Sequence, residues 1–277
     1  MTAKLDRFAE LVTRDQFNLA EACLMVAEDA YPDVDATGCL RQLEAMAATV
    51  RGRLASDAFP EQRVAALNHY LFGELQFSGN ADAYYDPRNS YLNEVLERRT
   101  GIPITLSIVY LEVGRRVGLR LQGASFPGHF LVKLRVRRGQ LVLDPFAGGE
   151  PQSVASLRSR LTRLMPESRA ARIDVAELLE TATPRQIVAR VLRNLKAIYL
   201  QAERYSQALA VMNRMLLVVP ESAAELRDRG LVYERLQCFR AALADLSNYA
   251  RRAPAAADLA EVRGRIVALH AACARLH

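Results

Sequence analysis

Few side chains in the middle of this chain could carry out acid–base or nucleophilic chemistry. His129 carries an imidazole, the side chain that most often acts as a general base. Thr105 and Ser107 supply hydroxyls, but no cysteine lies between Cys39 and Cys238. Because a hydroxyl is much less acidic than a thiol, it would need a general base and an oxyanion hole to act as a nucleophile. Composition therefore excludes a thiol nucleophile from the middle of the chain.

The cysteines predict neither a metal centre nor a disulfide framework. The chain has four cysteines: Cys23, Cys39, Cys238 and Cys273. They show neither the close pairs of a zinc site nor the density of a secreted scaffold. We therefore expect reduced thiols, no metal and no cofactor. The stretch from Met1 to Glu10 lacks the apolar run of a signal peptide, and no stretch reaches the roughly 18 apolar residues of a membrane span. The expected location is the cytoplasm, without a membrane partner.

Charge is unevenly distributed along the 277 residues. Residues 1–100 carry 10 Lys/Arg against 16 Asp/Glu, and residues 101–277 carry 27 against 15. A basic half can bind nucleic acid, here through the cluster of Arg135, Arg137 and Arg138. However, no aromatic residues are interleaved with the basic ones to stack on bases. Nucleic-acid binding through these basic strands is thus the weakest of three functional hypotheses.

The order of the elements predicts an α+β fold. Apolar residues at helical spacing indicate a layer of N-terminal helices broken at Pro32, and a polar loop follows in which Asn89 or Ser90 could cap a helix through Arg98. A buried helix is expected from Pro103 to Val117. After Gly118 the apolar residues alternate, which indicates a strand over 121–126 and a β-hairpin over 130–143. A buried helix followed by consecutive antiparallel strands is typical of an α+β core.

The C-terminal third contains an internal repeat. Tyr199, Ala208 and Pro220 recur 34 residues later as Tyr233, Ala242 and Pro254, and Gly230 recurs as Gly264. Thirty-four residues is the period of the tetratricopeptide repeat, in which an aromatic of the first helix packs on the small residue of the second. We expect two repeats over 184–220 and 221–254, followed by a capping helix over 259–276.

Four motifs together resemble one bacterial family. They begin at residues 89, 101, 126 and 143 and read NSYLN, GIPITLS, FPGHF and LDPF. The chain is similar in these motifs to the SirB-type, transglutaminase-like proteins with tetratricopeptide tails. The resemblance implies a papain-like, transglutaminase-like core with an antiparallel sheet, an N-terminal helical layer and an all-α tail. The expected domains are a core over 1–165, a linker over 166–183 and repeats over 184–277.

The resemblance also implies where a catalytic triad would lie. In active transglutaminase-like enzymes a cysteine opens the core helix, a histidine begins the next strand and an aspartate ends the following one. His129 and Asp144 occupy the histidine and aspartate places, whereas the cysteine's place falls at Pro103. Thr105 is then the nearest hydroxyl, and Ser107 follows it. A structural reading stays open as well, because a lone histidine is often structural and Asp144-Pro145 could be a simple turn.

The hairpin register tests whether His129 and Asp144 can meet. A two-residue turn at Arg138-Gly139 would pair His129 with Gly148, four residues from Asp144, which is roughly 13 Å along the strand. For the two to face each other, the hairpin must be centred near Val136-Arg137 or contain a bulge. The resemblance implies that it is so arranged.

Further binding residues are expected outside the triad. Asn93 and Phe126 are expected at the cleft, although an asparagine often only satisfies loop backbone. In the repeats, Arg190, Arg193 and Gln201 are expected to line a concave groove, where the arginines could bind a carboxylate of a partner peptide. The alternative is that these helices simply pack on the core.

The sequence leaves three functional hypotheses. The first is a non-catalytic binding or regulatory protein, a pseudoenzyme whose core lacks its nucleophile and whose tail binds a protein or peptide. The alternative is a hydrolase or acyl transferase that uses Thr105 or Ser107 with His129 and Asp144. The third is the nucleic-acid binder. The missing cysteine favours the first.

Overall fold

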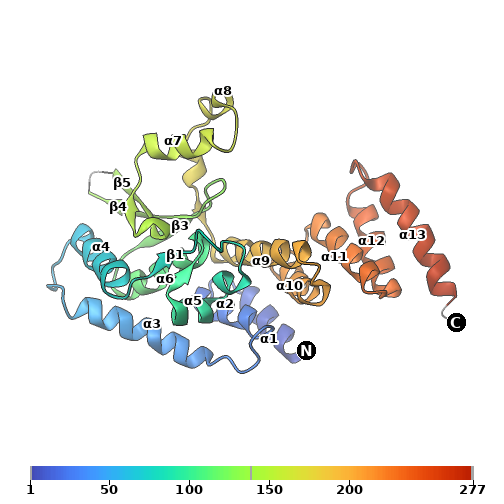
Figure 1. Cartoon of the computed structure of the whole chain (residues 1–277), viewed down its shortest axis with the longest axis horizontal. Helices are drawn as coiled ribbons and strands as arrows, with labels where there is room; N and C mark the ends of the chain where they lie inside the picture. The colour runs from blue at the N-terminus through green and yellow to red at the C-terminus, as the bar shows by residue number, and fades with distance from the viewer. Residues whose placement is uncertain (1, 138, 276–277) are drawn as a thin grey trace. The chain divides into compact units, whose positions relative to one another are not determined.

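The chain forms two compact units in a computed structural model that describes residues 2–137 and 139–275 (Figure 1). One unit runs from Gln16 to Val191. The other joins the N-terminal segment up to Asp15 with the residues from Leu192 onward. No helix among the described residues is long and apolar enough to span a membrane.

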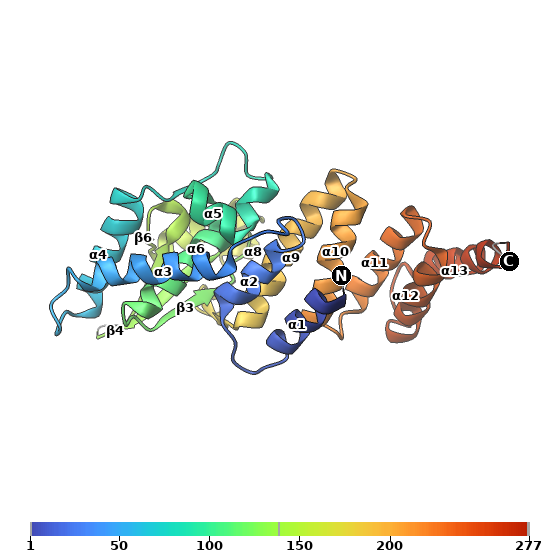
Figure 2. The ribbon, with the colours of Figure 1, turned by 90° about the horizontal axis from the view of Figure 1, so that it is seen from below.

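The first unit is built around a buried helix, α6 (Pro103–Arg116). Pro103 occupies its first turn, where proline is well tolerated because the N–H of that position lacks a helical partner. Helices α2 (Leu19–Ala27), α3 (Ala36–Arg51) and α5 (Leu92–Arg98) pack against α6, and Figure 2 shows α3 running across it. An apolar helix of this kind must be covered on several sides to be stable in water.

The antiparallel sheet lies against α6. Its central strands are β3 (Leu121–Ala124), β4 (Leu131–Val136) and β5 (Gly139–Asp144), and its edges are β6 (Glu150–Pro151) and β7 (Thr181–Ala182). The strand order is β6-β5-β4-β3-β7, with every pairing antiparallel. The predicted α+β class with an antiparallel sheet is confirmed.

The second face of the sheet is covered by α7 (Val154–Thr162), α8 (Glu167–Ala170) and the 3₁₀ turn η4 (Glu177–Leu179). Their apolar side chains share a buried cluster with Leu131 and Val142 of the sheet. The stretch 166–183, for which the sequence predicts a linker, thus contains α8, η4 and the edge strand β7.

The hairpin turn lies between the two registers considered from the sequence. Val136 pairs with Gly139, so residues 137 and 138 connect β4 to β5, and Arg138 lies outside the described residues. Gly139 has a φ of 128°, a backbone conformation that favours glycine. The observed pairing is centred one residue before Arg138-Gly139 and one residue after Val136-Arg137, the position near which the resemblance places it.

The N-terminal layer continues beyond α3 with α4 (Pro60–Asn68), which runs into a π-helical segment, η1 (His69–Glu74). Two short strands, β1 (Ser78–Gly79) and β2 (Thr100–Gly101), pair in parallel. Between them in the sequence lie a 3₁₀ turn, η2 (Pro87–Ser90), and α5. The predicted helix cap at Asn89 or Ser90 was wrong, because Tyr91 is the N-cap of α5. The Asn89 amide instead donates to the carbonyl of Ala83, at 2.7 Å.

The second unit contains the tetratricopeptide repeats. Helix α9 (Pro184–Gln201) enters it from the first unit and is followed by α10 (Tyr205–Val218), α11 (Ala223–Arg235), α12 (Phe239–Arg252) and α13 (Leu259–Ala274). Successive helices from α10 to α13 pack against each other, and α1 (Thr2–Val12) packs against α10. Tyr199, Ala208 and Ala242 are buried as the repeat predicts. The tetratricopeptide tail is therefore confirmed.

Candidate functional site

The structure brings His129 and Asp144 into direct contact. The chain reverses before β4, where the His129 N–H donates to the Phe126 carbonyl at 3.0 Å and Gly128 has a φ of 64°. This turn places the imidazole at the end of β5, with Nε2 of His129 2.8 Å from Oδ1 of Asp144. The pair meets although the register does not place the two residues opposite each other, and His129 lies just before β4, outside the strand.

A third residue, Arg160, completes the cluster. Asp144 follows Val142 by two residues, so its side chain points to the face of the sheet that α7 covers. There Nη2 of Arg160 lies 2.5 Å from Oδ2 of Asp144, and the Phe146 N–H donates to Oδ1 at 3.1 Å. Asp144 is fully buried. An unpaired buried carboxylate would be strongly destabilising, and the Arg160 guanidinium compensates its charge.

The sequence analysis did not identify Arg160. It lies in no recognisable motif, and its contact with Asp144 depends on how α7 packs on the sheet. The only local signal is that Leu157 and Leu161, on either side of it along the helix, are buried and direct that face of α7 inward.

Aromatic side chains flank the pair. The ring of Phe146 lies edge-on to His129, with centroids 5.9 Å apart, and Tyr84 lies edge-on to Phe146 at 6.4 Å. Burial raises the pKa of the Tyr84 hydroxyl. His129 is only 8% exposed, so little of the imidazole can be reached from solvent. The surrounding side chains thus leave the histidine nearly covered.

The first turn of α6 contains Pro103 and Thr105. Pro103 is buried there and offers neither a hydrogen-bond donor nor a nucleophilic atom. The Thr105 hydroxyl donates to the Asn89 carbonyl at 2.7 Å and accepts from the Ile102 N–H at 3.2 Å. It serves the local backbone, as a capping residue does.

Ser107 is also unsuited to catalysis in this conformation. Its side chain is fully buried and its hydroxyl has no hydrogen-bond partner among the described residues. Within the described chain, neither Ser107 nor Thr105 forms a hydrogen bond with His129. Hydrogen-bond contact with a base is the requirement for activating a hydroxyl.

The two residues expected at the cleft lie in different environments. The Phe126 side chain is fully buried in the cluster beneath α7 and α8, where it contributes to packing. Asn93, in the first turn of α5, lines a separate pocket with residues of the α2–α3 connection. Within the described residues, no group of three or more His, Cys, Asp or Glu side chains could hold a metal ion.

Comparison with known proteins supplies the family. A model described as the transglutaminase-like superfamily matches residues 37–193, and a tetratricopeptide-repeat model matches residues 195–266. The chain belongs to the transglutaminase-like superfamily.

Relatives within the transglutaminase-like superfamily align along most of this chain. A UPF0162 protein of Xylella fastidiosa is 42% identical, covering 91% of this chain and 89% of its own. A UPF0162 protein of Vibrio cholerae is 31% identical over 87% of this chain and 88% of its own. Protein SirB1 of Salmonella typhimurium is 25% identical over 86% of this chain and 89% of its own. The SirB-type resemblance is confirmed.

The groove residues predicted for the tail of this transglutaminase-like protein differ in exposure. Arg190 belongs to the core unit, where its guanidinium lies over the Phe130 ring at 5.8 Å and faces the Phe126 carbonyl. Arg193 and Gln201, further along α9, are exposed. Arg135 and Arg137 are exposed near the hairpin turn, whereas Arg138 lies outside the described residues.

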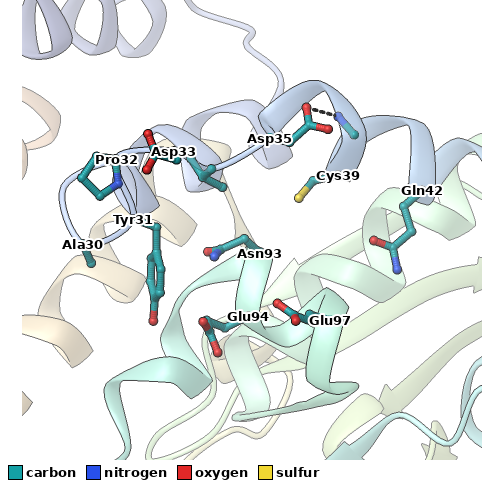
Figure 3. Close-up of a pocket in the computed structure, with 12 residues that line it drawn as sticks. Ala30, Tyr31, Pro32, Asp33, Asp35, Cys39, Gln42, Asn93, Glu94 and Glu97 are labelled. Carbon is teal, nitrogen blue, oxygen red and sulfur yellow. Dashed lines mark hydrogen bonds between the residues drawn. The ribbon is translucent and has the colours of Figure 1, made fainter.

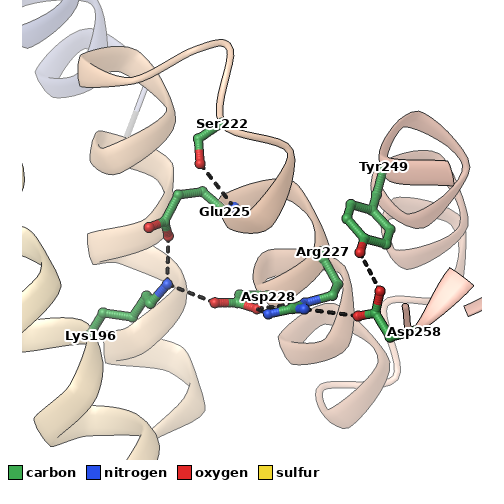
Figure 4. A network of polar contacts seen from close by, with 7 residues as sticks. All are labelled: Lys196, Ser222, Glu225, Arg227, Asp228, Tyr249 and Asp258. Carbon is green, nitrogen blue, oxygen red and sulfur yellow. Dashed lines mark hydrogen bonds and ion pairs between the residues drawn. The ribbon is translucent and has the colours of Figure 1, made fainter. Parts of the chain in front are cut away.

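A polar network joins the repeats (Figure 4). Nζ of Lys196 contacts Glu225 at 2.6 Å and Asp228 at 2.8 Å. Arg227 then links Asp228 to Asp258, with Nη1 of Arg227 2.8 Å from Oδ2 of Asp258. Because several charges interact at once and are partly buried, such a network contributes more than isolated surface pairs do.

Proposed function

We propose that this protein is a non-catalytic binding or regulatory protein: a transglutaminase-like core without its nucleophile, joined to a repeat tail that binds a protein or peptide. The observation that carries the proposal is Pro103 at the first position of the core helix, where the active enzymes of the family have a cysteine. A proline cannot attack a carbonyl carbon or donate a hydrogen bond.

The bonds of the other candidate nucleophiles support the same conclusion. A hydroxyl becomes a nucleophile when a base removes its proton. The Thr105 hydroxyl is hydrogen-bonded to backbone groups, and the Ser107 side chain is fully buried in the core unit. The remaining pair, His129 and Asp144, keeps the form of a catalytic site and serves stability or ligand binding. The hydrolase or acyl transferase reading would require the surroundings of Thr105 or of Ser107 to rearrange.

The tail supports a protein or peptide partner. Tetratricopeptide repeats present a concave surface built from successive first helices, and Arg193 and Gln201 are exposed on α9. An exposed guanidinium can bind a partner carboxylate through paired hydrogen bonds. We further propose that the protein acts in the cytoplasm, and that neither nucleic acid nor a membrane is its partner.

Two measurements test this proposal. The purified protein should show no turnover above background across amide, ester and glutamine substrates. Activity that disappears in both Thr105→Ala and His129→Ala would overturn the non-catalytic reading and support the hydroxyl nucleophile.

The partner is tested by affinity purification from the native cell with mass spectrometry. Arg193→Glu should lose the specifically captured protein, whereas Arg163→Glu, an equal charge change at an exposed site of the core unit, should retain it. A capture profile that Arg193→Glu leaves unchanged would contradict the role given to α9.

A further inference from the structure

A pocket with an acidic lining lies in the core unit, between the α2–α3 connection and α5 (Figure 3). Its volume is about 610 Å³, within the range of small-molecule sites. Four carboxylates line it, two from each side: Asp33, Asp35, Glu94 and Glu97. Neither His129 nor Asp144 lines this pocket, so it is separate from the candidate triad.

Most of this negative charge has no directly bound counter-charge, although Arg88 attracts Glu94 electrostatically. Asp35 accepts a hydrogen bond from the Gly38 N–H at 2.8 Å and lies 3.6 Å from the exposed guanidinium of Arg41. In the described part of the chain, the other three carboxylates form no ion pair or hydrogen bond. Arg88, the basic residue near Glu94, is bound to Asp86. Like charges that gather without a counter-charge favour a cationic ligand.

The uncharged lining residues suit the same ligand. The Tyr31 ring forms one wall beside Glu94 (Figure 3), and an aromatic ring attracts a cation over its face. Asn93 lies between the two acidic sides, and its Oδ1 has no hydrogen-bond donor among the described residues. Since an unsatisfied acceptor destabilises the free protein, a ligand N–H group that reaches this oxygen gains a bond that the protein lacks.

The pKa of the Cys39 thiol also reflects the negative charge of the pocket. The thiol lies on the α3 side of the pocket (Figure 3), and its pKa is raised by burial and by the charges of Asp35 and Glu97. The residues that face this cavity therefore supply acceptors, negative charge and an aromatic surface, and no lysine or arginine lines it.

We propose that this pocket binds an organic cation that carries several N–H donors, with a guanidinium group as the best fit. A guanidinium is planar, can bond a carboxylate through two parallel N–H groups and can stack on an aromatic ring. A metal ion fits less well, because no group of three or more His, Cys, Asp or Glu among the described residues could hold one. The guanidinium could belong to free arginine or to an arginine side chain of a peptide.

Calorimetry with two probes tests the site and distinguishes these sources. Free arginine and a capped Ala-Arg-Ala peptide are titrated into the full-length protein, with citrulline as the neutral isostere. We expect at least one of the two cations to bind, and citrulline not to bind. Binding of arginine alone indicates a small-molecule ligand, and binding of the peptide alone indicates a protein-borne one. Failure of both cations to bind at millimolar concentration would overturn the proposal.

Paired variants then locate the binding. Glu94→Gln combined with Glu97→Gln should weaken binding at least about tenfold, because both substitutions remove charge while keeping the shape. Asp57→Asn removes an exposed carboxylate outside the pocket and should change affinity by less than about twofold. Equal effects of the two sets would show nonspecific electrostatic attraction and contradict the proposal.

Alkylation provides a second, independent readout. The bound cation should slow the reaction of Cys39 with iodoacetamide, followed by mass spectrometry, and leave the exposed Cys238 in the repeat unit unaffected. Protection of neither thiol despite binding would place the ligand elsewhere and overturn the assignment of this pocket.

Discussion

The Nε2 atom of His129 lies 2.8 Å from a carboxylate oxygen of Asp144, whose side chain is fully buried. Removing either side-chain partner of this carboxylate, His129 or Arg160, should therefore cost stability. We expect His129→Ala to lower the free energy of unfolding by about 1 to 3 kcal/mol and Arg160→Met by about 3 kcal/mol. Urea unfolding followed by circular dichroism measures both.

The matched background for these variants is Asp144→Asn, which removes the charge and keeps the shape. In that background Arg160→Met should cost much less, because no buried charge is left unpaired. Additive losses in the double variant would show that the cluster is not energetically coupled.

Pro103→Cys tests whether the start of α6 faces His129. A thiol at a helix N-terminus beside an imidazole should have a pKa below about 7.5, lower than an ordinary thiol. Thiolate absorbance as a function of pH measures it, with the natural protein's four cysteines as the baseline. Adding His129→Ala should return the thiol pKa towards its ordinary value.

The thiol pKa tests the position of residue 103 relative to His129, whereas turnover tests catalysis. A new thiol with an ordinary pKa, unaffected by His129→Ala, would mean that position 103 does not face the histidine. Turnover by the Pro103→Cys variant alone would show that the core lacks only its nucleophile.

The two glycines related by the 34-residue repeat should respond oppositely to alanine. A Cβ at Gly230 would lie 2.8 Å from Cγ of Leu246, whereas a Cβ at Gly264 meets nothing within 4 Å. We expect Gly230→Ala to destabilise the protein by about 1 to 3 kcal/mol through overpacking. Gly264→Ala should stabilise it by up to about 1 kcal/mol through higher helix propensity. Thermal unfolding compares them, and equal effects would contradict the packing of α11 on α12.

Acid should weaken the repeat unit through Asp258. The hydrogen bond from Tyr249 and the ion pair with Arg227 hold the pKa of Asp258 below its usual range. A carboxyl group whose pKa is lower in the folded state stabilises that state above the unfolded pKa of about 4 and loses this contribution as pH falls through both values. Asp258→Asn should reduce the acid-induced loss seen in urea unfolding between neutral pH and about pH 3. An unchanged pH dependence would exclude Asp258 as the titrating group.

Much of this architecture could be predicted because its signals are local. The alternating residues of β4 and β5 and the 34-residue spacing of Tyr199 and Ala208 depend only on nearby chain. Contacts between distant segments could not be predicted in this way. Asn89 has the right chemistry for a helix cap, but its amide bonds to a loop carbonyl, and Arg160 meets Asp144 only because α7 packs on the sheet. The exact hairpin register likewise depends on the backbone of the turn.

The edge strand β7 determines where the chain can be divided. Thr181 and Ala182 pair with Ala124 and Gly123 of β3, although they follow the central hairpin by more than thirty residues. A fragment that stops at residue 165 would leave the backbone groups of β3 unpaired along an open edge, a template for intermolecular strand addition. Such a fragment should aggregate during expression, whereas one that continues to Val191 keeps the edge covered. Strand β7, just before the repeats, thus protects the core from self-association by covering this edge of the sheet.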